Sequence, residues 1–191
     1  MTITPTSLPD VLLIKLQKLE DNRGWFTESF RLDLLEKATG HPINFCQENL
    51  AKSNFGVVRG LHYQLPPYAQ SKLVSVIHGR VLDVVVDMRV NSRNFGKHIS
   101  IELGGENLNQ LFIPRGFAHG YSCLTSSAKF IYKVDNFYNK QSEKSIAFND
   151  PVLNIDWRIP PKKLVVSQKD NNQPNFNDAE PFEIKTSLYD Y

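Results

Sequence analysis

The sequence has 191 residues, of which 41% are hydrophobic and 22% charged, and its formal net charge is +2. This length favours one domain, residues 1–191, with a hydrophobic core, and the small net charge gives no indication of nucleic-acid or membrane binding. Cys46 and Cys123 form no CxxC pair, so neither a zinc site nor a disulfide framework is predicted. The apolar patch at Val11–Leu16 is too short to span a membrane and follows no basic segment. We therefore expect a cytoplasmic protein.

One helix is predicted near the N-terminus, in the stretch SFRLDLLEKATG. Ser29 is expected to cap its first turn, and Leu32 and Leu35 share one face. Gly40 suits the left-handed position that follows a last helical turn. No second helix of this length is evident.

The rest of the chain is predicted to form strands. SKLVSVIHGRVLDVVVDMR contains two β-rich runs around a hairpin-like break at His78–Gly79. Further short runs follow at 97–103, 109–113, 117–124 and 128–138. Many short strands separated by turns favour an antiparallel sandwich or barrel. After Pro151 the chain is rich in Pro, Asn and Asp, so 171–191 is expected to be an irregular surface tail.

Two stretches carry polar side chains that are unremarkable by themselves. DNRGWFTESF contains Arg23 and Glu28, and in isolation it fits a plain turn with solvated charges. QENLAKS contains Gln47 and Asn49, and it fits a polar edge strand.

The stretch RGLHYQ raises a sharper question. Arg59, His62 and Lys72 fall within fourteen residues of a β-rich region. A lone histidine is more often structural than catalytic. Two cations beside a neutral base would, however, suit an anionic substrate or an anion formed during a reaction. Both interpretations stay open on these residues alone.

The stretch IPRGFAHGY has the spacing P-x-G-x-x-H, formed by Pro114, Gly116 and His119, which matches half of the usual cupin signature. The other half needs an H-x-H pair and a downstream glutamate. Here the corresponding place is His62-Tyr63-Gln64, so the second histidine is missing. A metal site needs three or four convergent ligands, so none is predicted. A metal-dependent cupin oxygenase or isomerase is the competing interpretation of this spacing.

Alternating aromatic residues mark the stretch AKFIYKVDNFY. If this strand is continuous, Tyr132 and Tyr138 face the same way, and Tyr132 can face the same cavity as His62. An aromatic stripe in the core is the commoner role of such residues, although a buried tyrosine hydroxyl needs a partner.

Taken together and in order, these stretches resemble dTDP-4-dehydrorhamnose 3,5-epimerases, from about Asp10 to Asp170. The resemblance adds FNDPVLNIDW and SQKD to the stretches above. It implies an all-β fold, a cupin-type jelly-roll barrel of antiparallel strands with one or two short helices. It also implies a homodimer in which N-terminal strands are exchanged, no metal or other cofactor, and a dTDP-linked 4-keto-6-deoxy sugar as substrate.

The implied reaction inverts C3 and C5 of dTDP-4-dehydro-6-deoxy-D-glucose, giving dTDP-4-dehydro-L-rhamnose for L-rhamnose biosynthesis. His62 resembles the base that removes protons next to the C4 ketone, and Asp170 the carboxylate that orients it. Lys72 resembles the cation near the C4 oxygen, where an enolate needs stabilisation. Tyr132 resembles the acid that returns a proton to the opposite face.

The resemblance also implies a set of substrate-binding residues. Tyr138 matches an aromatic that stacks on thymine, and His119 a residue on the sugar side. The full set is Arg23, Glu28, Gln47, Asn49, Arg59, His119, Tyr138, Glu143 and Lys169. The segment 156–170 is longer and more basic than in the family, which leaves the position of Asp170 for the structure to decide. The same residues are also compatible with a 5-only or 3-only epimerase. A non-catalytic sugar-binding protein is a further alternative, but it would leave His62, Lys72 and Tyr132 without a joint explanation.

Overall fold

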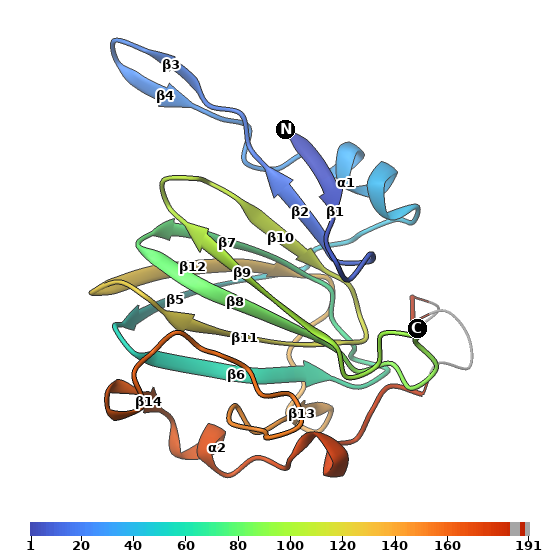
Figure 1. The fold of residues 1–191 in the computed structure, drawn as a ribbon. Helices are drawn as coiled ribbons and strands as arrows, with labels where there is room; N and C mark the ends of the chain where they lie inside the picture. The colour runs from blue at the N-terminus through green and yellow to red at the C-terminus, as the bar shows by residue number, and fades with distance from the viewer. Residues whose placement is uncertain (184–187, 190–191) are drawn as a thin grey trace.

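Two β-sheets face each other in the computed structural model of this chain, which describes residues 1–183 and 188–189 (Figure 1). The strand order is β1-β2-β10-β7-β12-β5 in the first sheet and β13-β6-β11-β8-β9 in the second. Among the described residues, β14 pairs in parallel with β6, and the other strand ladders are antiparallel. The predicted all-β, antiparallel architecture is therefore confirmed.

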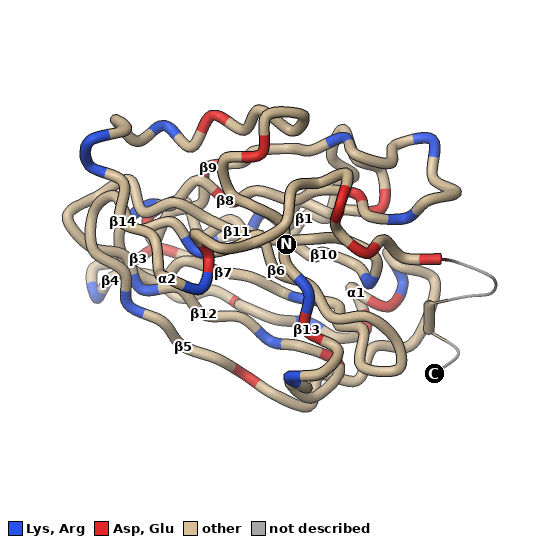
Figure 2. The backbone as a smooth tube through the Cα atoms, turned by 90° about the horizontal axis from the view of Figure 1, so that it is seen from below, with Lys and Arg blue, Asp and Glu red and all other residues tan. Residues whose placement is uncertain are grey.

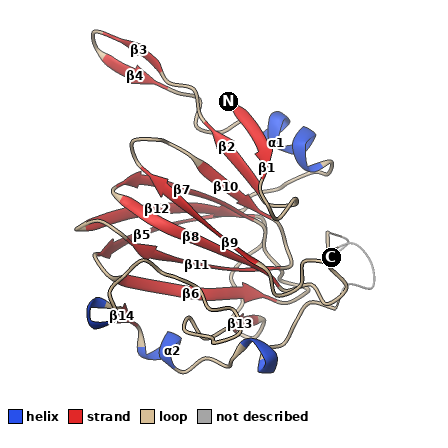
Figure 3. Ribbon diagram, viewed as in Figure 1, coloured by secondary structure: helices blue, strands red, loops and turns tan. Residues whose placement is uncertain are grey.

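Strands account for most of the regular structure (Figure 3). The first sheet contains β1 (Thr2–Pro5), β2 (Leu12–Lys15), β5 (Gln47–Asn54), β7 (Lys72–His78), β10 (Gln110–Ile113) and β12 (Ser127–Val134). The second contains β6 (Val57–Gln64), β8 (Arg80–Asp87), β9 (His98–Gly104), β11 (Phe117–Cys123), β13 (Glu143–Ser145) and β14 (Val165–Val166). A separate hairpin of β3 (Leu19–Asp21) and β4 (Gly24–Phe26) projects from the body (Figure 1). The helical segments are α1 (Leu32–Thr39), α2 (Gln168–Asn171), η1 (Pro161–Lys163) and η2 (Phe176–Asp178).

Helix α1 confirms the predicted helix but not its predicted cap. Arg31 precedes the first turn, with no side-chain cap. The backbone oxygen of Ser29 instead accepts a hydrogen bond from the Gln110 side chain at 3.0 Å, so Ser29 belongs to the preceding connection. Gly40 ends the helix as predicted, because its φ of 79° is left-handed and its N–H bonds to the Glu36 carbonyl.

The predicted hairpin-like break at Gly79 is a crossing between sheets. β7 and β8 flank this glycine, but they belong to different sheets and share no ladder. Gly79 has a φ of 74°, and a Cβ there would lie 2.1 Å from the Ser127 backbone oxygen. Only glycine fits this tight turn, and the turn directs the chain across the molecule.

The core has two main layers, one on each side of the second sheet. Between the sheets, Val74 and Phe130 of the first pack against Val81 and Val85 of β8. Beyond the second sheet, the other face of β8 packs under the C-terminal segments, in a cluster that includes Leu82, Val84, Val86, Met88, Trp157, Phe182 and Leu188. β8 is therefore buried on both faces.

The segment predicted as a surface tail contributes to this core. Phe176, Phe182 and Leu188 are each at most 9% exposed. The prediction is wrong for these residues, because the outer face of the second sheet is apolar and they cover it. Residues 184–187 and 190–191 of the tail lie outside the described part of the chain.

Basic and acidic residues are interspersed along the backbone rather than gathered at one end of the molecule (Figure 2). None of the helices in residues 1–183 and 188–189 is long and apolar enough to cross a membrane.

Candidate active site

A cavity of about 670 Å³ lies between the two sheets. Most of the residues predicted for the site line it. They are Gln47, Asn49, Arg59, His62, Lys72, His119, Tyr132, Tyr138, Glu143 and Asp170. The structure thus gathers residues that are spread over more than 120 positions of the sequence, from 47 to 170.

A bulge in β6 explains how Arg59 and His62 both face this cavity. Residues three apart on a regular strand point to opposite faces. Here His62 pairs with His119 and Arg59 with Tyr121, so β6 has one more residue than β11 between the pairs. The extra residue rotates the strand and brings both side chains to one side.

Gly60 makes this bulge possible. Its φ is 118°, and a Cβ on it would lie 2.6 Å from the Cα of Gly120 on the adjacent strand. β6 and β11 therefore approach so closely at Gly60 and Gly120 that a side chain at Gly60 would force them apart.

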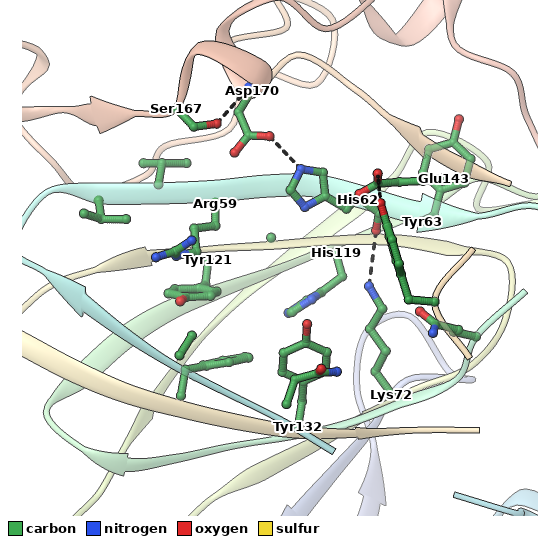
Figure 4. Close-up of a pocket in the computed structure, with 18 of the residues that line it drawn as sticks. Arg59, His62, Tyr63, Lys72, His119, Tyr121, Tyr132, Glu143, Ser167 and Asp170 are labelled. Atoms are coloured by element: carbon green, nitrogen blue, oxygen red, sulfur yellow. Dashed lines mark hydrogen bonds and ion pairs between the residues drawn. The ribbon is translucent and has the colours of Figure 1, made fainter. Parts of the chain in front are cut away.

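His62 is held by a carboxylate from the C-terminal part of the chain. Its Nε2 lies 2.6 Å from Oδ1 of Asp170, whose side chain is 6% exposed (Figure 4). Ser167 caps α2 by accepting the Asp170 N–H at 3.0 Å, which fixes the position of the carboxylate. Burial would raise the Asp170 pKa, but hydrogen bonds with His62, Ser167 and the Gly60 backbone hold it below its usual value. Asp170 is thus an anion beside His62.

Lys72 is buried below His62. Its Nζ donates to the His62 backbone oxygen at 3.3 Å (Figure 4). Burial lowers the Lys72 pKa to about 8, although the charges of Asp83 and Glu143 oppose this shift. Because little solvent surrounds this ammonium group, it can interact strongly with a negative oxygen placed in the cavity.

A second histidine–carboxylate pair lies deeper. His119 Nε2 is 2.9 Å from Oδ2 of Asp83, and both side chains are at most 8% exposed. Burial lowers the His119 pKa and raises the Asp83 pKa, in each case against the charge of the other. The carboxylate fixes the orientation of the His119 ring, which lines the cavity.

Tyr132 enters the cavity from the other wall. It belongs to β12 of the first sheet, whereas His62 belongs to β6 of the second, and the two side chains project toward one another (Figure 4). Burial raises the Tyr132 pKa, and the neighbouring Tyr121 adds to the effect. Its hydroxyl is therefore protonated at neutral pH and can donate.

The outer part of the cavity is a network of polar side chains. Tyr138 donates its hydroxyl to Glu143 at 2.9 Å, and Lys169 reaches the same carboxylate at 2.7 Å. The Tyr138 N–H donates to Gln47, whose side-chain amide donates to Asn49. β12 ends at Val134, so the predicted continuous strand to Tyr138 is wrong, and these hydrogen bonds orient Tyr138 instead.

Three of the predicted residues do not line the cavity. Lys169 lies at the edge of the cavity, where it donates to Glu143, a residue that does line the cavity. Arg23 lies on the β3–β4 hairpin, where its side chain is 85% exposed and pairs with Asp21. Glu28 follows the hairpin and lies 3.6 Å from Arg31.

Three residues that sequence reasoning did not select contribute to the site. Asp83 pairs with His119, and Ser53 accepts a hydrogen bond from Nε of Arg59 at 3.1 Å. Tyr121 lines the cavity, and its hydroxyl lies 2.9 Å from that of Ser53. A charged Asp83 within the apolar run RVLDVVVD was a signal that could have identified it.

The described residues contain no group of three His, Cys, Asp or Glu side chains arranged to hold a metal ion.

Two facing antiparallel sheets around a polar cavity define a cupin-like jelly-roll protein. The chain belongs to the dTDP-4-dehydrorhamnose 3,5-epimerase family, whose model matches residues 5–178. The chain is 46% identical over 182 residues to the dTDP-4-dehydrorhamnose 3,5-epimerase of Shigella flexneri, covering 95% of this chain and 99% of that protein.

Two solved structures are also similar. The dTDP-4-dehydrorhamnose 3,5-epimerase of Elizabethkingia anophelis superposes with a TM-score of 0.90 at 49% identity, covering 93% of this chain and 97% of that one. The dTDP-6-deoxy-D-glucose-3,5-epimerase of Legionella pneumophila, solved in complex with dTDP-4-keto-L-rhamnose, gives a TM-score of 0.88 at 41% identity, covering 92% and 93%.

Proposed function

We propose that this chain epimerises C3 and C5 of dTDP-4-dehydro-6-deoxy-D-glucose, with His62 as the base and Tyr132 as the acid. One observation carries the assignment of roles: the two side chains project into one cavity from different sheets. Inversion at a carbon needs removal of a proton on one face and its return on the other. A base and an acid on opposite walls meet this need, whereas one group acting alone would restore the original configuration.

The proposed step begins with His62, oriented by Asp170, taking the proton from a carbon next to the C4 ketone. The electron pair of that C–H bond moves to the C4 oxygen and forms an enolate, which the Lys72 ammonium stabilises. Tyr132 then donates its proton to the opposite face of the carbon. His62 carries an extra proton afterwards and Tyr132 lacks one. Exchange with water restores both, which the 30% exposure of the His62 side chain permits.

The outer cavity is proposed to hold the nucleotide. The Tyr138 ring would stack on thymine, and the Arg59 guanidinium, whose Nε donates to Ser53, would contact a phosphate. The matches to named 3,5-epimerases favour this function over that of a metal-dependent cupin. A cytoplasmic location stays a prediction from the sequence.

Deuterium incorporation tests the proposal. The 4-keto sugar nucleotide is incubated with the protein in D₂O, and NMR follows deuterium separately at C3 and C5. We expect deuterium at both carbons, and at neither with His62→Asn. Tyr132→Phe should still exchange protons but lose most net inversion, since it keeps the base and lacks the acid. Deuterium at one carbon only would mean a 5-only or 3-only epimerase, and none with the native protein would refute the proposal.

We further propose a homodimer in which the β3–β4 hairpin of each copy completes the cavity of the other. The hairpin projects from the body, and Leu19, Trp25 and Phe26 on it are 51–65% exposed (Figure 1). An exposed apolar hairpin of this kind favours coverage by a partner. Arg23 and Glu28, which lie outside their own cavity, would then reach the second one.

Sedimentation and complementation test this assembly. We expect a dimer at micromolar concentration, and a monomer of low activity for Trp25→Asp. Mixing inactive Arg23→Ala with inactive His62→Asn should restore activity, because each heterodimer contains one cavity with neither change. A fully active monomer would contradict the proposal.

A further inference from the structure

The C-terminal part of the chain contacts the second sheet beside His62. The ring of Phe182 is 1% exposed and lies 5.5 Å from the ring of Tyr63, the residue after His62 on β6. The Tyr63 hydroxyl donates to the Glu180 backbone oxygen at 2.5 Å. Phe182 also donates its N–H to the Met88 carbonyl at 2.8 Å, which ties this segment to the end of β8.

The same part of the chain contacts the first sheet beside Lys72. The Tyr189 hydroxyl lies 2.9 Å from Oγ of Ser71, which is fully buried and immediately precedes Lys72. The centroid of the Tyr189 ring lies 3.7 Å from that of the His41 ring and 5.1 Å from the Arg115 guanidinium. Arg115 also donates to the Leu188 carbonyl at 3.0 Å, so it contacts both Leu188 and Tyr189.

Ser71 is fixed on its other side as well. Its N–H donates to Oδ1 of Asp135 at 2.6 Å, and Asp135 forms a buried ion pair with Arg115 at 3.1 Å. The hydroxyl of Tyr189 therefore completes a rigid set of hydrogen bonds around the residue that precedes β7.

These contacts matter because β6 and β7 belong to different sheets. In the described part of the chain no backbone ladder joins these two strands, and a 3.3 Å bond from Lys72 Nζ to the His62 oxygen links them directly. In the proposed reaction the base and the enolate-stabilising cation must both fit one sugar ring. A shift of about 1 Å in such a pair can cost about 10²-fold in rate.

We propose that Tyr189 is a positioning residue, which fixes Lys72 relative to His62 through Ser71. Together with Phe182, which contacts the second sheet, it forms what we call the C-terminal clamp. This inference rests on the proposed function. A role in stability alone is the competing explanation, and it predicts a lower melting temperature with unchanged turnover.

Three variants and a matched control separate the two explanations. Tyr189→Phe removes only the hydroxyl, Ser71→Ala removes its partner, and the double variant removes both. Ser122→Ala is the control, because Ser122 is also fully buried, its hydroxyl donates to the Trp157 carbonyl at 2.7 Å, and it does not line the cavity. Turnover, KM, deuterium incorporation and melting temperature are measured for each.

We expect kcat and the rate of deuterium incorporation to fall about tenfold in both single variants, with KM within about twofold of the native value. The Tyr189 hydroxyl also accepts the Arg115 N–H at 3.4 Å. The double variant should therefore be no slower than Tyr189→Phe, because that change already removes the hydrogen bond to Ser71. Ser122→Ala should lose stability and keep its kcat. Native kcat in Tyr189→Phe, or an equal loss in Ser122→Ala, would overturn the clamp while leaving the epimerase intact. Absence of exchange in the native protein would instead overturn the proposed function, and the clamp with it.

Discussion

Replacing Asp170 by asparagine tests the histidine–carboxylate pair with little change in shape. The carboxylate lies 2.6 Å from His62 Nε2 and is nearly buried, with 6% of its side chain exposed. In the proposed mechanism His62 becomes an imidazolium once it has taken a proton. The Asp170 anion stabilises this cation, and Asp170→Asn removes the charge while retaining a polar partner.

The magnitude follows from Coulomb's law. At an effective dielectric constant of about 20, opposite unit charges about 3 Å apart attract by roughly 5 kcal/mol. An amide dipole keeps part of this stabilisation, so we expect a loss of roughly 3 kcal/mol. That loss corresponds to a decrease of about 10²-fold in kcat.

Steady-state turnover and deuterium incorporation measure this loss, with Asp150→Asn as the control. Asp150 is a buried carboxylate that accepts the N–H groups of Val152, Leu153 and Phe176 and does not line the cavity. It should lose about 1–3 kcal/mol of stability and keep its kcat. If kcat of Asp170→Asn stayed within about threefold of native, or fell no further than in Asp150→Asn, the assigned role would be refuted.

Three further predictions concern the buried side chains of Lys72 and Phe182. Because burial lowers the Lys72 pKa to about 8, kcat should fall above that pH as the ammonium is lost, whereas Lys72→Arg should show no such decline up to about pH 10. The unfolded chain binds this proton up to a higher pH than the folded one, so the Lys72 contribution to stability should rise between pH 8 and 10.5, visible in urea titrations. Phe182→Ala should lower the free energy of unfolding by about 3–5 kcal/mol, since this ring is 1% exposed, against about 0.5 kcal/mol for Phe137→Ala, which is 61% exposed. Equal losses would mean that the C-terminal segment adds nothing to the core.

The strands were predicted well from the sequence, because alternation and turn residues are local signals. The separation of β7 and β8 at Gly79 could not be predicted, since the partner of a strand is chosen by contacts far away in the chain. The burial of Phe182 and Leu188 was also missed. It depends on an apolar outer face of the second sheet, which the order of residues alone does not reveal.

Most of the site residues were predicted from the resemblance to the epimerase family, and the fold brings them together. They include Asp170, which reaches His62 despite the long segment that precedes it. Nothing local in the sequence indicates that Gly60 forms a bulge. Only the structure explains why Arg59 and His62 face the same side of the strand. Asp83 and Ser53 were missed because each acts through another side chain, and such contacts have no fixed spacing along a chain.

The separation of 108 residues between His62 and Asp170 has a consequence for synthesis on the ribosome. The strands of the first sheet are complete in sequence at Val134, and Asp170 follows 36 residues later (170 minus 134). At about 5–20 residues per second, this is a delay of roughly 2–7 s. Every strand of the first sheet has thus been translated before the carboxylate that pairs with His62. The His62–Asp170 pair can therefore form only after all strands of the first sheet have been synthesised.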